Sequence, residues 1–144
     1  MMRCLGATLI LFGIAAAPMG AAETGFRTSR AGVRQEVIAV IEEQLAAFRQ
    51  GDVAKAYACA AAAVRGQNSE RRFAAIVREN YPEIWANRGA DYGLVHDDGT
   101  HATVRVFVSS KAGRGAYDYV LIRERAGWRI GSVMHHDPRR KSTV

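Results

Sequence analysis

Two short stretches decide the fold of this chain, VRQEVIAVIEEQLAAF at residues 33–48 and TVRVFV at residues 103–108. In the first, apolar residues recur every three or four positions and draw one face of an α-helix, as Val33, Val37, Ile41, Leu45 and Phe48. In the second, valines alternate with other residues, which is the period of a β-strand with one buried face. The chain therefore combines helix and strand, with helix first.

Two further helices are predicted between these stretches. Gly51 ends the first helix, and Asp52 is the N-cap of an alanine-rich helix that runs to residue 65. Ser69 begins a third helix. Pro82 closes that helix, because the residue before a proline avoids the helical region.

After residue 89 the apolar period changes from 3.6 to 2. The sequence Asp97-Asp98-Gly99-Thr100 is typical of a hairpin turn, and residues 109–115 are predicted to be a flexible loop. Four antiparallel strands are predicted, at residues 92–95, 103–108, 116–124 and 128–134.

This order predicts an α+β fold in which three N-terminal helices pack on a curved four-stranded antiparallel sheet. The chain has 144 residues, of which 49% are hydrophobic and 24% charged, so we expect one globular domain. Seven apolar residues are expected to share its core: Ile41, Leu45, Phe48, Val104, Val106, Trp128 and Ile130.

Residues 1–22 have the organisation of a secretory signal peptide. Arg3 supplies the positive start, an apolar stretch follows, Pro18 breaks it, and Gly20-Ala21-Ala22 precedes the expected cleavage site. The alternative is an uncleaved membrane anchor, but a spanning helix needs about 20 apolar residues and this stretch is shorter. We therefore expect a periplasmic or secreted protein with no stable membrane span after cleavage.

Cleavage leaves a single domain at residues 23–137 and a basic tail at residues 138–144. Cys59 is then the one remaining cysteine, so an intramolecular disulfide is excluded and a buried, inert thiol is expected. The shortened chain has a net charge of +5, with acidic residues interspersed among the basic ones. Because export removes the protein from nucleic acid, a solvated surface is expected rather than a nucleic-acid interface.

Two sequence patterns resemble the nuclear transport factor 2-like superfamily. They are Ile41-x3-Leu45-x-Ala47-Phe48-x2-Gly51-Asp52-x4-Tyr57 and, much later, Gly127-Trp128-Arg129-Ile130. Within that superfamily the chain is similar to a bacterial exported family of unknown function, which also has the pattern matched here by Phe73-x3-Val77-x3-Tyr81-Pro82. The resemblance implies a cone-shaped roll with a cavity between sheet and helices, often dimeric through the sheet. It implies no activity, because such a scaffold hosts enzymes and non-enzymes.

The expected cavity makes a small apolar ligand the first functional hypothesis. Tyr57, Tyr81 and Trp85 are the candidate ligand-binding residues, because each combines an apolar ring with a hydrogen-bonding tip. The alternative is that the three rings fill the core. A cavity below about 300 Å³ would be too small for an ordinary ligand. The sheet face that carries Arg105, with Thr103 and Phe107, would then be the expected protein-binding surface.

An enzyme, namely a small isomerase or hydrolase, is the second hypothesis, and it needs an ionisable group in the cavity. Asp118, His101 and His135 are the residues to inspect. The more ordinary expectation is that Asp118 points to solvent or pairs with an arginine such as Arg105 or Arg123.

A third hypothesis is a structural dimerisation module, which requires a filled cavity and an apolar sheet surface. No metal or other cofactor is expected, because the histidines at positions 96, 101, 135 and 136 supply only parts of a ligand set. The favoured function is non-catalytic binding of a small apolar ligand or of a protein partner, which includes a second copy through the sheet.

Overall fold

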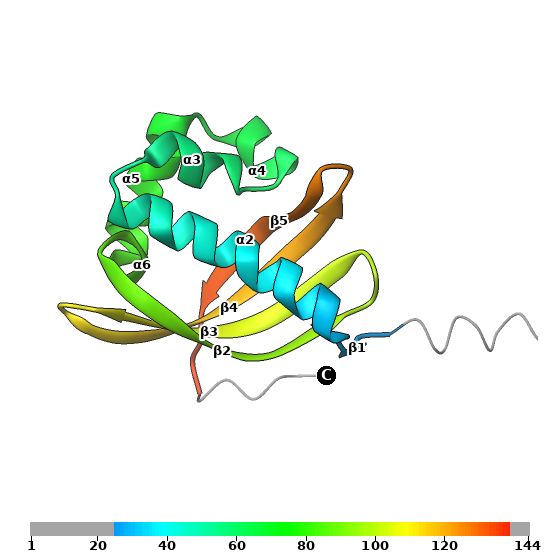
Figure 1. Cartoon of the computed structure of the whole chain (residues 1–144). Helices are drawn as coiled ribbons and strands as arrows, with labels where there is room; N and C mark the ends of the chain where they lie inside the picture. The colour runs from blue at the N-terminus through cyan, green and yellow to red at the C-terminus, as the bar shows by residue number, and fades with distance from the viewer. Residues whose placement is uncertain (1–24, 139–144) are drawn as a thin grey trace, which may run out of the picture.

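A computed structural model describes residues 25–138 of the chain (Figure 1). The predicted signal peptide and the predicted tail from residue 139 onward lie outside the described residues. The described helices are α2 (Ala31–Arg49), α3 (Val53–Ala58), α4 (Ala62–Gln67), α5 (Glu70–Asn80) and α6 (Pro82–Trp85). The strands are β1 (Arg27–Thr28), β2 (Asn87–Asp97), β3 (His101–Ser110), β4 (Gly113–Glu124) and β5 (Gly127–His135). The predicted α+β class is confirmed.

The strands form one open antiparallel sheet in the order β1-β2-β3-β4-β5. The sheet curves around α2, and α3, α4 and α5 lie on the far side of that helix (Figure 1). All the described helices therefore lie toward one face of the sheet, which we call the inner face. The opposite face is the outer face, and no described helix covers it (Figure 1).

The predicted second helix is divided in two, which corrects the prediction of three helices. Its middle residues leave the helix so that Ala60 can form a parallel bridge with Ile130 of β5. Ala61 N donates to the Ile130 carbonyl at 2.8 Å, and Ile130 N donates to the Cys59 carbonyl at 2.9 Å. An edge strand has unpaired backbone groups, and satisfying two of them outweighs the helix preference of alanine. Pro82 likewise does more than close a helix, because it begins α6 as its first residue.

The sheet is larger than predicted, with five described strands instead of four. The predicted loop at residues 109–115 is mostly strand, because β3 continues to Ser110 and β4 begins at Gly113. Gly113 has a φ of 127°, a conformation that glycine adopts at little cost in so tight a turn. The added strand β1 has two residues, too few to show an alternating pattern in the sequence.

The predicted core is confirmed. All seven expected residues are buried in one cluster between α2 and the inner face, with Ile41 and Leu45 fully buried and Trp128 2% exposed. The start and end signals around Gly51 are also confirmed, because α2 ends at Arg49 and the Asp52 carboxylate accepts a hydrogen bond from Lys55 N at 3.1 Å. The core thus fixes α2 against the sheet, on the face opposite to the outer face.

Candidate functional site

Two hollows lie on opposite faces of the sheet. The inner cavity has a volume of about 140 Å³ and lies between the helices and β5. The outer groove has a volume of about 530 Å³ and lies across β2, β3, β4 and β5 on the outer face. The inner cavity is lined mainly by apolar side chains, among them Phe48, Phe73, Ile76, Val77, Ile84, Ile130 and Val133.

The inner cavity includes one of the three predicted ligand residues. Tyr81 lines it, and its hydroxyl donates to the Val133 carbonyl at 2.9 Å. Tyr57 does not line it; its hydroxyl lies 2.5 Å from the Asn68 carbonyl and ties α3 to the segment before α5. Trp85 packs on Phe48 with ring centroids 5.6 Å apart. Tyr57 and Trp85 therefore have packing contacts, as the alternative in which the rings fill the core would require.

Gln44 lines the inner cavity, and the sequence analysis did not select it. It lies on the buried face of α2 and is 4% exposed, so it places an amide in a mainly apolar wall. Its position directly before Leu45, a residue of the predicted apolar face, is the sequence signal that could have identified Gln44. The cavity volume is below the lower limit of about 300 Å³ for ordinary ligand sites, so a ligand of ordinary metabolite size does not fit there.

One row of side chains crosses the outer groove from edge to edge. A β-bulge places Gly93 and Leu94 of β2 opposite Arg105 of β3, Arg105 pairs with Asp118 of β4, and Asp118 pairs with Met134 of β5. The two apolar members are strongly exposed, Leu94 at 67% and Met134 at 55%. The transverse row therefore reads apolar, positive, negative, apolar.

Asp118 is held on the outer face by two partners. Arg105 Nε donates to Asp118 Oδ1 at 2.8 Å, and His136 Nδ1 lies 3.1 Å from Asp118 Oδ2. The expected pairing of Asp118 with Arg105 is confirmed. Asp118 does not line the inner cavity, so it is not placed to act there as the base of an isomerase or hydrolase.

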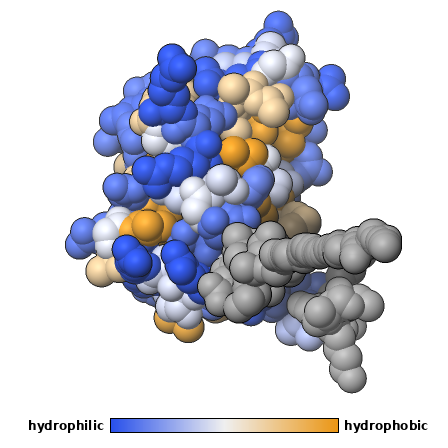
Figure 2. Space-filling model, turned by 90° about the vertical axis from the view of Figure 1, so that its right-hand side faces the viewer, coloured by the Kyte–Doolittle hydropathy of each residue, from blue (hydrophilic) through white to orange (hydrophobic). Residues whose placement is uncertain are grey.

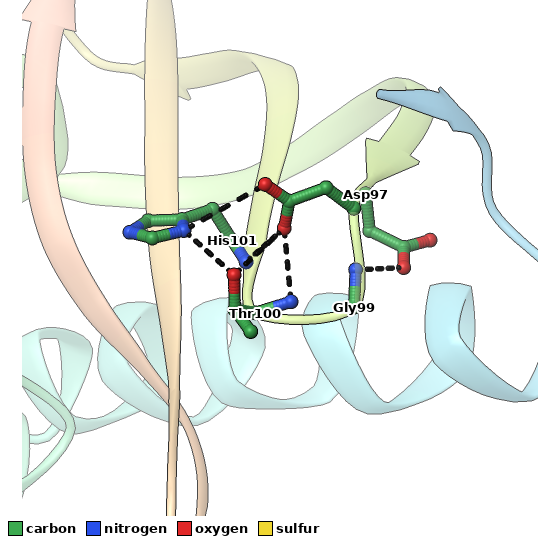
Figure 3. Close-up of polar contacts among 5 residues, drawn as sticks. Asp97, Gly99, Thr100 and His101 are labelled. Carbon is green, nitrogen blue, oxygen red and sulfur yellow. Dashed lines mark hydrogen bonds and ion pairs between the residues drawn. The ribbon is translucent and has the colours of Figure 1, made fainter. Parts of the chain in front are cut away.

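The two other candidate catalytic residues also lie away from the inner cavity. His135 stacks on Tyr81 at the end of β5, and its Nε2 lies 2.8 Å from the Asn80 carbonyl. His101 lies at the β2–β3 turn (Figure 3), where its Nδ1 is 3.0 Å from Thr100 Oγ1. A carbonyl only accepts, so Nε2 is the donor in the contact of His135.

The β2–β3 turn is stabilised by its own two carboxylates (Figure 3). Asp98 Oδ1 accepts from the backbone N–H groups of His101 at 2.7 Å and Thr100 at 2.9 Å, and these bonds hold the pKa of Asp98 below its ordinary value. Asp97 Oδ2 accepts from Gly99 N at 2.9 Å. These contacts explain the polar residues of the turn as structural. Within residues 25–138, no group of three or more His, Cys, Asp or Glu side chains is arranged to hold a metal ion.

Cys59 is buried beside the bridge to β5. Burial, and secondarily the charge of Glu43, raises the pKa of its thiol to about 11. The predicted buried thiol is confirmed, and at neutral pH it is almost entirely protonated.

A comparison with known proteins identifies the family. A family model described as "Domain of unknown function (DUF4864)" matches residues 31–143. The chain belongs to the DUF4864 family. No curated protein and no solved structure matches the chain. The matched segment of this DUF4864 protein spans both hollows, and its description assigns no activity to either.

None of the described helices is both long and apolar enough to cross a membrane. The side of the molecule in Figure 2 is mainly hydrophilic where it is not covered by grey atoms, and its apolar residues form small separate patches.

Proposed function

We propose that this protein is an exported, non-catalytic domain that associates with a second copy of itself through the outer groove. The observation that carries the proposal is the transverse row of Leu94, Arg105, Asp118 and Met134. A dimer interface with two-fold symmetry has to be complementary to itself, because each copy presents the same patch.

The transverse row is complementary to itself when the two-fold axis runs parallel to the strands, between β3 and β4. Such an axis reverses the order of the row in the second copy. Arg105 then faces the second copy's Asp118, and Leu94 faces its Met134. Phe107 and Ala116, the next pair along β3 and β4 on this face, meet in the same reversed order and add apolar contact.

The charges favour this axis over the other two-fold axis that lies in the plane between the two sheets. An axis along the row itself would place Arg105 against Arg105 and Asp118 against Asp118, and like charges in contact are unfavourable. Two sheets that pack face to face lie about 10 Å apart, so side chains of the length of leucine and methionine meet in the middle.

Charge reversal tests the proposal. Arg105→Glu gives a row with two negative charges, and Asp118→Arg gives a row with two positive charges. Each variant alone should be mainly monomeric in sedimentation or light-scattering measurements, whereas an equal mixture of the two should form a heterodimer. Only contact between copies produces that recovery, because each chain keeps its own like-charged pair.

The control is Arg72→Glu, an exposed arginine on α5 far from the outer face in the fold. It should dimerise like the unmodified protein. A chain that stays monomeric at about 100 µM, a concentration well above the Kd of a specific dimer, would rule out the proposal. A dimer insensitive to both charge reversals would place the interface elsewhere.

Export and the wider fold family belong to the same proposal. Support for export is the charged start, apolar stretch and small-residue cleavage site in residues 1–22. Support for a nuclear transport factor 2-like roll is the sequence resemblance, together with a curved antiparallel sheet that has its helices on one side (Figure 1).

A further inference from the structure

The inner cavity is lined by a glutamine whose amide oxygen has no donor among the described residues. Gln44 is fixed by its amide nitrogen, because Nε2 donates to the Ala56 carbonyl at 3.1 Å. Its Oε1 accepts no hydrogen bond from any of the residues 25–138. The side chain is 4% exposed and lines the cavity. This oxygen is therefore available to a bound molecule that supplies a donor.

Three other polar residues line the wall: Tyr81 and Asn68, which form hydrogen bonds with the backbone, and the exposed Ser132. The Tyr81 hydroxyl donates to the Val133 carbonyl, and Asn68 Nδ2 donates to the Val64 carbonyl at 3.1 Å. Most of the remaining wall is aromatic or aliphatic. The cavity is therefore mainly apolar, and the Gln44 amide is one of its few polar groups.

We propose that the inner cavity binds a neutral, ring-sized molecule with a single O–H or N–H donor, of the chemical class of phenol. The ring would contact the apolar wall and the donor would bond to Gln44 Oε1. The volume of about 140 Å³ agrees with this size, because an apolar cavity of about 150 Å³ in another protein binds benzene. This inference is independent of self-association, which uses the opposite face of the sheet.

The competing occupant is water. One water molecule needs two to four polar partners. Besides Gln44 Oε1, this mainly apolar wall offers Ser132 and two side chains, Asn68 and Tyr81, that already bond to the backbone. Water at this position is therefore poorly held, and a molecule that replaces it while keeping the bond to Gln44 has an advantage.

The test compares phenol with toluene, which has the same number of heavy atoms and no donor. Each is titrated into the full protein while backbone amide shifts are followed by NMR. Saturable shifts at residues around the cavity are expected, and phenol should bind about three- to tenfold more tightly than toluene, the gain of one net hydrogen bond.

Three variants separate the contributions. Gln44→Met keeps the size of the side chain and removes the acceptor, so the phenol hydroxyl would be buried without a partner and toluene should bind more tightly than phenol. Gln35→Met changes an exposed glutamine of the same helix and should leave the preference intact. Val64 is a half-buried residue of α4 that lines the cavity, so Val64→Phe should fill the cavity and abolish binding of both probes.

Several outcomes would overturn the proposal. These are the absence of saturable shifts up to about 10 mM phenol, equal affinity for phenol and toluene in the unmodified protein, or undiminished phenol binding to Val64→Phe. Should Gln44→Met fail to fold, the comparison of the two probes and the Val64→Phe variant still decide. A negative result for probe binding would not affect the proposal of self-association. That proposal is tested separately, by measuring molecular mass and by charge reversal on the outer face.

Discussion

Tyr117 and Tyr119 lie two residues apart on the same face of β4, and only Tyr117 has a hydrogen-bond partner for its hydroxyl. The Tyr117 hydroxyl donates to Glu83 Oε2. The Tyr119 hydroxyl is fully buried and has no partner among residues 25–138. Two chemically identical groups in one strand thus differ in whether their burial is compensated.

This difference predicts opposite effects of removing the two hydroxyls. Tyr119→Phe should leave the free energy of unfolding unchanged or raise it by about 1 kcal/mol, because an unpaired buried polar group is lost. Tyr117→Phe should lower it by about 1–3 kcal/mol, because Glu83 loses its donor. Urea denaturation of the two variants measures both values. Each variant is the control for the other, and a larger loss for Tyr119→Phe would contradict the structure.

Alkaline titration should detect these tyrosines together with Tyr92, whose hydroxyl donates to Glu42 Oε1. Burial is the main cause that raises the pKa of all three phenols well above the ordinary 10.0. A raised pKa favours the protonated form in the folded state, so this stabilisation is complete below pH 10.0 and is lost as the pH rises further. Phenolate absorbance of these residues should appear only with unfolding. Normal titration of all tyrosines in the folded protein would contradict this.

The Cys59 thiol should react slowly. Its pKa is raised from 9.0 to about 11, chiefly by burial, so its thiolate is scarce at pH 8. The linked stabilisation is present below pH 9.0 and is lost as the pH rises toward about 11. In the chain that starts at Glu23, alkylation followed by mass spectrometry should be far slower in native protein than in urea, and Cys59→Ala should remove the reaction. Equal rates in the two conditions would show that the thiol is accessible.

Trp128→Ala should lower the free energy of unfolding by about 3–5 kcal/mol, the usual loss for a large core aromatic. Trp128 is 2% exposed and its ring lies under the Arg123 guanidinium at 5.5 Å. Thermal unfolding gives the measurement. Trp85→Ala is the matched control and should cost less, because Trp85 is only half-buried. An unchanged melting temperature for Trp128→Ala would contradict the core assignment.

Export predicts that the protein isolated from its native host starts at Glu23. Intact mass spectrometry should give the mass of residues 23–144, and Ala22→Arg should block cleavage and leave the full-length mass. Recovery of the unmodified full-length chain in the membrane fraction would overturn the prediction.

The sequence determined the elements whose signals are local. The apolar period of residues 33–48 predicted α2, Gly51 and Asp52 predicted the break that follows it, and the alternation of residues 103–108 predicted β3. Ile41 and Trp128 were predicted to share a core for the same reason, because periodicity alone shows which side of an element is apolar.

Only the tertiary structure decided the features that depend on partners distant in the chain. Residues 59–61 leave a favourable helix because they form hydrogen bonds with the edge of β5. The local sequence of these residues gives no sign of that distant partner. The outer row exists because strand register aligns Leu94, Arg105 and Met134 across a bulge. The free acceptor of Gln44 likewise depends on where Ala56 lies. Each of these features results from contacts between segments that are distant in the chain. The secondary-structure propensities of the individual residues therefore cannot predict them.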